Sequence, residues 1–374
     1  MKKRSKINIL ADKISKFLWR YFELFAIVFV SVSPLKSIPA EIVFLIVLII
    51  ANRRYLCCSR RLILLLAICF IVPTAIDMAL HHAVGFSPHS VVFPLYFTLG
   101  YVMSRKYRFE ELWLRLEEIF IALAALSLFG FALQCFFPEI ISGTIMYEMN
   151  GVSHRSILIN NFLYVGDYQV LRNCGIAWEP GVFQILLNLG LAYSIFNYRG
   201  KKLFARVAIY GITIFTTKST AGYVISLLLV ITLIIKYRKY FWLIALGAIC
   251  LWPFISSEIA YQFAYKTPGS DSFSARFVPA VNVFRNNFAK PFGEGNIGYE
   301  LSYKKDKLGS FDSYSQIFVR YGYPLLICCL AQALALCRAN WALGAVVVLS
   351  FLSEPVWGTI LFSMILWSAD TRLD

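Results

Sequence analysis

Hydrophobic residues in this chain are gathered into long runs that polar segments separate. The runs are about 15 to 24 residues long, which is the length that a helix needs to cross roughly 30 Å of hydrocarbon. The pattern predicts an all-α polytopic integral membrane protein that forms one transmembrane domain over residues 1–374. Division of the chain at the runs gives twelve candidate spans, near residues 18–35, 38–52, 61–80, 90–104, 114–137, 180–197, 203–217, 219–236, 240–256, 314–337, 341–354 and 355–369.

Composition supports the same class of protein. Hydrophobic residues make up 59% of the chain and charged residues 15%, against roughly 25% charged residues in an ordinary globular protein. The mean hydropathy is +0.66. A soluble fold of this size could not bury so much apolar surface, so extracellular modules, disordered proteins and soluble enzymes are excluded.

The net charge of +15 is distributed unevenly across the expected membrane. If the N-terminus is cytoplasmic, 24 of the 36 Lys and Arg residues fall on the inner side and 12 on the outer side. This asymmetry is the positive-inside signature, and an even number of spans then places both termini in the cytoplasm. Nucleic acid is not expected as a partner, because its recognition needs basic and aromatic residues interleaved on a water-exposed surface.

Two polar segments are much longer than the others, and both fall on the outer side in this topology. Residues 138–179 and 257–313 are dense in Asn, Arg, Asp, Ser, Tyr and Gly. Aromatic residues recur through both segments, which argues against disorder. Long loops of this kind are usually functional. We therefore expect two ordered outer, periplasmic loops that carry the function.

The second loop contains a stretch with helical period near residues 274–288. Arg276 and Arg285 lie about 180° apart around such a helix and flank its apolar stripe. One interpretation is an interfacial helix whose arginines reach to either side of the stripe, and the other is that one arginine meets a lipid-linked phosphate. The stripe consists of Phe277, Val281, Phe284 and Phe288.

The most specific local string is Trp178-Glu179-Pro180-Gly181, which opens a candidate span directly after the first long loop. Proline is favoured in the first turn of a helix, and a carboxylate is favourable near a helix N-terminus. Yet Glu is not a preferred capping residue. The string therefore fits either a plain helix start or a functional carboxylate at the membrane surface.

This string resembles the acid-Pro-Gly motif of bacterial oligosaccharide repeat-unit polymerases, the Wzy-type enzymes of the O-antigen polymerase and ligase superfamily. Further strings between residues 150 and 330 agree with that family in their order along the chain. They are Thr217–Tyr223, Ser274-Ala275-Arg276 followed by Pro291–Gly295, and Asp312–Gln316 followed by Tyr321-Gly322.

The resemblance implies a metal-independent glycosyltransferase of the GT-C type in the bacterial inner membrane. Such an enzyme joins undecaprenyl-diphosphate-linked oligosaccharides into O-antigen or capsular polysaccharide on the outer face. A hydroxyl of one repeat unit attacks the anomeric carbon next to the diphosphate of another chain, with inversion. No cofactor is implied, and the partners are the lipid-linked substrates, membrane lipid and a chain-length regulator.

The leaving diphosphate carries concentrated negative charge, which arginine forks bind well. The resemblance therefore makes the arginines of the two outer loops candidates for diphosphate binding. They are Arg155 and Arg172 in the first loop, and Arg276 and Arg285 in the second.

The attacking hydroxyl needs a general base within hydrogen-bond reach. Glu179 is the first candidate. Related ligases often have His in the segment that returns to the membrane, where this chain has Asp312, so Asp312 is the second candidate. His154 is a further acid–base candidate. Trp178 is a candidate for substrate binding. Tyr314, with Tyr261 and Tyr265, is a candidate for stacking on sugar rings, and the alternative for these tyrosines is an aromatic belt at the membrane interface.

Three other features stay open at this stage. Glu354-Pro355 repeats the acid-Pro pair at an outer turn, where such a pair usually only begins a helix. A disulfide between Cys135 and Cys174 is possible on the outer side, although the sequence does not determine pairing. No cysteine pair has metal-ligand spacing, and no metal is expected.

Two other functions compete with polymerisation. The O-antigen ligase belongs to the same superfamily, and the histidine missing from the returning segment argues modestly against it. A flippase or transporter of lipid-linked oligosaccharides would need a hydrophilic, cation-rich cavity deep in the membrane. This chain has its polar residues at the outer surface instead.

Overall fold

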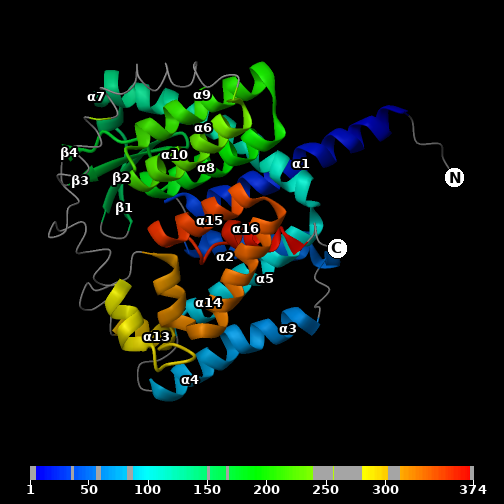
Figure 1. Ribbon diagram of the computed structural model, residues 1–374, viewed down its shortest axis with the longest axis vertical. Helices are drawn as coiled ribbons and strands as arrows, with labels where there is room; N and C mark the ends of the chain where they lie inside the picture. The colour runs from blue at the N-terminus through cyan, green and yellow to red at the C-terminus, as the bar shows by residue number, and fades with distance from the viewer. Residues whose placement is uncertain are drawn as a thin grey trace.

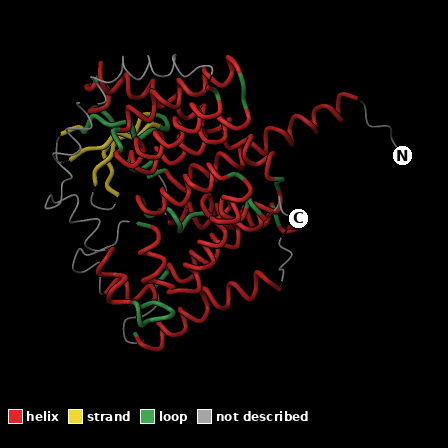
Figure 2. Tube along the Cα trace, in the orientation of Figure 1, coloured by secondary structure: helices red, strands yellow, loops and turns green. Residues whose placement is uncertain are grey.

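The computed structural model describes residues 6–34, 38–55, 60–81, 87–149, 152–165, 168–238, 256, 280–301 and 312–370. These residues are mostly helical, and one small sheet interrupts the pattern (Figure 2). The helices are α1 (Lys6–Val32), α2 (Ile38–Ala51), η1 (Arg53–Tyr55), α3 (Arg60–Leu66), η2 (Ala67–Ile71), α4 (Val72–Leu80), α5 (His89–Lys106), α6 (Phe109–Phe136), α7 (Pro138–Ser142), α8 (Pro180–Asn197), α9 (Gly200–Thr217), α10 (Thr220–Lys236), α13 (Gly295–Tyr299), α14 (Ser313–Ala339), α15 (Trp341–Ser353) and α16 (Ile360–Trp367).

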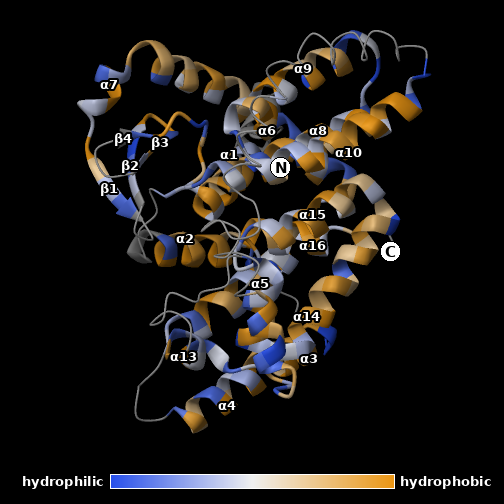
Figure 3. Ribbon diagram, turned by 60° about the vertical axis from the view of Figure 1, so that its left-hand side comes forward, coloured by the Kyte–Doolittle hydropathy of each residue, from blue (hydrophilic) through white to orange (hydrophobic). Residues whose placement is uncertain are grey.

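Three helical segments in this part of the chain are long and apolar enough to cross a membrane, namely Arg60–Leu80, Phe109–Phe136 and Ser313–Ala339. Large apolar side chains are exposed along several helices, which is the pattern that lipid contact favours. Figure 3 shows the apolar character of α2, α10 and α14. Length, composition and surface are those of an α-helical membrane protein.

Each expected span within the described residues contains a helix, but the expected span at 355–369 is helical only over Ile360–Trp367. Only the three segments above have the length and hydropathy of a full span, and shorter apolar helices occur at Glu41–Ala51, Thr220–Lys236 and Trp341–Ser353. The expected span at 240–256 lies almost entirely outside the described residues.

The first long loop folds into a four-stranded antiparallel sheet, so the all-α expectation is wrong for this segment. The strands follow one another in the order β1 (Met146–Met149), β2 (Val152–Ile157), β3 (Asn160–Val165) and β4 (Tyr168–Gln169). The β2–β3 hairpin pairs His154 with Leu163 and Arg155 with Phe162, and it turns through Leu158, whose φ is 57°. The strands are short and carry polar residues on both faces, which conceals the alternation that reveals a half-buried strand.

The described parts of the two long loops lie at one end of the helix bundle. In Figure 1 the sheet and α13 are both on the left, whereas α1 begins on the right and α16 ends toward that side. We call the end that carries the sheet and α13 the sheet end. That both long loops lie on the outer side of a membrane stays a prediction.

Buried carboxylates join the helices at the opposite end. Glu117 of α6 accepts a hydrogen bond from the Nε of Arg206 at 2.8 Å and one from the hydroxyl of Tyr198 at 3.0 Å. Glu23 of α1 pairs with Lys106 of α5 at 2.5 Å. Each carboxylate is almost fully buried, and each has its cation, as a buried charge requires.

The expected helix near residues 274–288 is observed for residues 280–287, and residues 274–279 lie outside the described part of the chain. Val283 is buried, and the ring of Phe284 stacks on Phe318 of α14 at 4.8 Å. Val281 and Phe288 are exposed. The helix therefore packs on α14 with one side and exposes Val281 and Phe288 on another. Its interfacial position stays a prediction.

Candidate active site

Glu179 is the residue that precedes the first turn of α8. Its backbone is extended, with φ −141° and ψ 149°, and Pro180 follows in the first helical turn. The carboxylate makes no capping bond to the helix and no hydrogen bond to any other described residue. The backbone of the adjacent Trp178 is held by α1, because its backbone N–H donates a hydrogen bond to the carbonyl of Val32 at 3.0 Å. The backbone on both sides of Glu179 is thus fixed, and its half-buried carboxylate accepts no hydrogen bond from a described residue.

Gly181 brings a second carboxyl group to the start of α8. A Cβ at this position would overlap Oε1 of Glu354, so the helix and the Glu354 side chain approach as closely as a glycine allows. Glu354 is 4% exposed and lies in the turn between α15 and α16. The acid-Pro-Gly string and the Glu354-Pro355 pair, 173 positions apart in the chain, are neighbours.

The segment that begins α14, at Asp312 and Ser313, contacts the turn that contains Glu354. The hydroxyl of Ser313 donates to the carbonyl of Glu354 at 2.6 Å and accepts from the N–H groups of Val356 at 2.9 Å and Trp357 at 3.2 Å. Asp312 caps α14 through the N–H of Ser315 at 2.8 Å. Of the two candidate bases, Asp312 is therefore engaged in a helix cap, whereas Glu179 is not.

The glycine-rich turn at residues 291–295 packs into a break in α14. Gly322 interrupts that helix with φ 67°, and a Cβ there would overlap the carbonyl oxygen of Pro291. Gly293 has φ 73°, and a Cβ there would lie 2.4 Å from the carbonyl oxygen of Val319. Both positions require glycine, which accounts for the glycines in the two strings.

Beyond this turn, α13 connects α4 to a buried arginine. Asp77 accepts hydrogen bonds from the N–H groups of Ile297 at 2.9 Å and Gly298 at 3.2 Å. Asn296 accepts from Nη1 of Arg320 at 2.9 Å. The Arg320 guanidinium lies 3.9 Å from the centre of the Tyr299 ring. The second loop is thereby attached to two membrane helices.

Arg320 is a site residue that sequence reasoning missed. It is 7% exposed, and its Nε has no hydrogen-bond partner in the described structure. No described carboxylate forms an ion pair with it. The signal was present, because one arginine stands inside an otherwise apolar span, and an ionisable residue there is a functional candidate by default.

The side chains of Arg172 and Arg155 donate hydrogen bonds to backbone carbonyl groups. Arg172 donates from Nε to the carbonyl of Thr217 at 3.1 Å and from Nη2 to that of Lys218 at 3.0 Å, which caps the C-terminus of α9. Arg155 donates from Nη1 to the carbonyls of Ser142 and Thr144. Both guanidinium groups thus shape the first loop, and Arg172 ties it to the Thr217–Tyr223 string.

The remaining candidates differ in accessibility. His154 is 1% exposed and stacks on Tyr147 at 5.7 Å, and this burial lowers the pKa of His154. Tyr314 is buried against Phe351 rather than presented to a ligand. Arg285 is exposed on the 280–287 helix, and Arg276 lies outside the described residues.

Cys135 and Cys174 are both free thiols, so the possible disulfide is absent. Cys174 is fully buried, and burial raises its pKa to about 12. A thiol with this pKa is protonated and unreactive at neutral pH. Among the described residues, no group of three or more His, Cys, Asp or Glu side chains could hold a metal ion.

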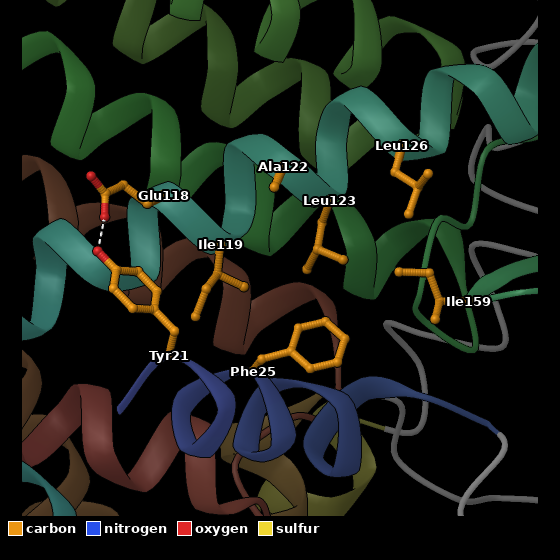
Figure 4. Close-up of a pocket in the computed structure, with 8 residues that line it drawn as sticks. All are labelled: Tyr21, Phe25, Glu118, Ile119, Ala122, Leu123, Leu126 and Ile159. Carbon is orange, nitrogen blue, oxygen red and sulfur yellow. Dashed lines mark hydrogen bonds between the residues drawn. The ribbon is translucent and has the colours of Figure 1, made fainter. Parts of the chain in front are cut away.

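An apolar groove of about 290 Å³ runs between α1 and α6 and reaches the β2–β3 hairpin (Figure 4). At one end of the groove the hydroxyl of Tyr21 donates a hydrogen bond to Glu118. The other lining side chains are all apolar. They are Phe25, Ile119, Ala122, Leu123, Leu126 and Ile159.

Comparison with family models, with curated proteins and with solved structures finds no match for this chain. The interpretation of the site therefore depends on its own residues and geometry.

Proposed function

We propose that this chain is a GT-C-type glycosyltransferase that polymerises undecaprenyl-diphosphate-linked oligosaccharide repeat units on the outer face of the bacterial inner membrane. In this proposal about twelve helices cross the membrane, both termini are cytoplasmic and the sheet end faces outward. One observation carries the proposal. Gly181 and Ser313, from two of the strings that resemble the polymerase family, both contact the Glu354 turn.

Glu179 is the general base in this proposal. Its carboxylate takes the proton from the acceptor hydroxyl as the oxygen attacks the anomeric carbon of the donor sugar. The new glycosidic bond forms while the bond from that carbon to the diphosphate oxygen breaks, and undecaprenyl diphosphate leaves with the electron pair. Asp312 serves α14 as a cap instead.

The leaving diphosphate needs positive charge close to the sugar. Arg276 remains the candidate from the second loop, and Arg320 joins it because its guanidinium is buried and its Nε has no hydrogen-bond partner in the described structure. A diphosphate oxygen would supply that buried donor with an acceptor. Arg155 and Arg172 contribute by ordering the loop that holds Glu179.

Replacement of Glu179 tests the proposal. Glu179→Gln keeps the size of the side chain and removes the base. The amount of long-chain polysaccharide, which appears on a gel as a ladder of bands, should therefore fall by roughly 10²- to 10⁴-fold while single repeats remain. Glu148→Gln, an exposed acid on β1 of the same loop, is the matched control and should leave the ladder intact. The measurement is gel separation of surface polysaccharide from cells that depend on the variant.

The possible outcomes separate the rival functions. An unchanged ladder in Glu179→Gln cells would refute the assignment of the base. Polymer that accumulates without transfer to lipid A core in cells without the protein would indicate a ligase. Repeat units retained on the cytoplasmic face in cells without the protein would indicate a flippase.

A further inference from the structure

Six exposed arginines gather at the end of the bundle that lies away from the sheet, where α16 ends (Figure 1). They come from three places in the chain, namely η1, the start of α3 and the turn from α5 to α6. We call them the basic cluster, which consists of Arg53, Arg54, Arg60, Arg61, Arg105 and Arg108. Arginines are common at one end of membrane spans. What distinguishes these six is that specific contacts bring their three segments together.

A buried network holds η1 beside the end of α5. Nζ of Lys106 donates to Oδ1 of Asn52 at 2.8 Å and to the carboxylate of Glu23 at 2.5 Å. Asn52 and Glu23 are both buried. Arg53 directly follows Asn52, and Arg105 directly precedes Lys106. The network therefore places the backbones of these two exposed arginines next to each other.

A pair of aromatic rings joins the start of α3 to the same place. The rings of Trp367 and Tyr101 meet edge to face at 5.1 Å. The guanidinium of Arg61 lies 5.8 Å from the centre of the Trp367 ring, and that of Arg105 lies 5.4 Å from the centre of the Tyr101 ring. Such cation–π contacts are favourable. Two arginines from different helices thus flank one aromatic pair.

The basic cluster keeps a net positive charge. Asp370 pairs with Arg61 at 3.5 Å, and the side chain of Arg61 stays 62% exposed. Two other carboxylates of this region are engaged by cations outside the cluster, since Glu23 pairs with Lys106 and Glu111 pairs with Arg20 and Arg115. The cluster therefore has charge to offer to an anion from outside the protein.

Exposed apolar side chains adjoin the arginines on both α2 and α3. Ile46, Val47 and Ile50 are exposed on the last two turns of α2, just before Arg53. Ile63 and Leu64 are exposed one turn after Arg60. A soluble phosphate would make no use of this surface, whereas a lipid would lay its acyl chains along it with its head group at the arginines.

We infer that the basic cluster binds the head group of cardiolipin, a phospholipid with two phosphate groups. Guanidinium groups bind phosphate in a bidentate manner, and basic pockets between membrane helices suit head groups of this kind. The cluster has two parts, one at the Asn52–Lys106 contact and one beside Trp367, and each part takes one phosphate. The inference does not depend on the proposed function.

Native mass spectrometry tests this inference. The full chain in detergent is mixed with tetraoleoyl cardiolipin, and the lipid that the protein retains is measured. Arg53→Gln combined with Arg105→Gln removes two charges at the Asn52–Lys106 contact and should weaken retention about tenfold or more. Lys201→Gln combined with Lys202→Gln is the matched control. It removes two exposed charges at the start of α9 and should leave retention unchanged.

A second double variant guards against a local folding defect. Arg54→Gln with Arg60→Gln removes one arginine from η1 and one from α3, and it should also weaken retention while the melting temperature without lipid stays that of the wild type. Equal retention of cardiolipin by the wild type, both cluster variants and the control would overturn the inference. Displacement of cardiolipin by inorganic phosphate would point to a soluble anion instead. Equal retention of dioleoylphosphatidylglycerol, which has one phosphate, would overturn the assignment to a lipid with two.

Discussion

Because Gly181 has no side chain, the Trp178–Gly181 string can lie directly against Glu354. Gly181→Ala inserts a methyl group where Oε1 of Glu354 lies, so the carboxyl group must move or α8 must shift. Overpacking of this kind costs about 1–3 kcal/mol. Because Glu354 can yield more easily than a helix, we expect the polysaccharide ladder to be lost before the melting temperature falls far.

Gly211 provides the matched control for that prediction. It lies in α9, and a Cβ there would meet no atom within 4 Å. Gly211→Ala should stabilise the helix by about 0.5–1 kcal/mol and leave the ladder unchanged. If Gly181→Ala and Gly211→Ala affect the ladder equally, the contact of Gly181 with Glu354 has no role in function.

His154 makes the stability of the sheet depend on pH. Burial lowers its pKa in the folded protein, whereas the unfolded chain has the ordinary value of about 6.5. As pH falls below about 6.5, the unfolded state takes up the proton first, so the free energy of unfolding decreases toward acid pH. Thermal melts at pH 7 and pH 5 should show a larger drop for the wild type than for His154→Phe, which keeps a ring against Tyr147.

The phenylalanine variant isolates the histidine because Nδ1 of His154 has no hydrogen-bond partner within the described structure. Its replacement therefore removes a proton-binding group without breaking a polar contact. A wild-type pH response in His154→Phe would assign the effect to other groups.

At the scale of whole helices, Glu117 is the contact that holds α6, α8 and α9 together. Its carboxylate is fully buried, and the side chain of its partner Arg206 is 16% exposed. Removal of one partner leaves a buried charge uncompensated, which costs about 3–5 kcal/mol. Arg206→Ala should therefore lower the melting temperature strongly in detergent. Arg20→Ala, which breaks a pair with Glu111 at an arginine side chain that is 46% exposed, should cost at most about 1 kcal/mol.

Helices were predictable from the sequence, and the sheet was not. A helix that faces lipid needs an apolar run long enough to be recognised in isolation, as residues 61–80 and 314–337 are. The strands in residues 146–169 are two to six residues long. Their hairpin turns through Leu158 rather than through the Asn-Gly or Gly pair that usually marks such a turn. Tertiary packing, not local sequence, determines this element.

The candidate active site was predictable only in part, for a reason that belongs to the whole molecule. The Trp178–Gly181 string can be recognised in the sequence because its residues are adjacent. Its contact with Glu354 and the contact of Asp77 with Gly298 join residues more than 170 positions apart. No local pattern encodes such pairs. Arg320 differs from these pairs, because an arginine inside an apolar span is visible in the sequence. What the sequence does not show is its contacts with Asn296 and Tyr299.

The assignment of sides governs every functional statement about this molecule, because a periplasmic polymerase must present Glu179 outward. Leu158 is 76% exposed at the tip of the β2–β3 hairpin, and Arg338 is exposed at the opposite end of α14. With the nine native cysteines replaced, Leu158→Cys should react with a membrane-impermeant maleimide in cells whose outer membrane is permeabilised. Arg338→Cys should react only after the inner membrane is opened. The reverse pattern would place the sheet end in the cytoplasm, where the proposed reaction has no substrate.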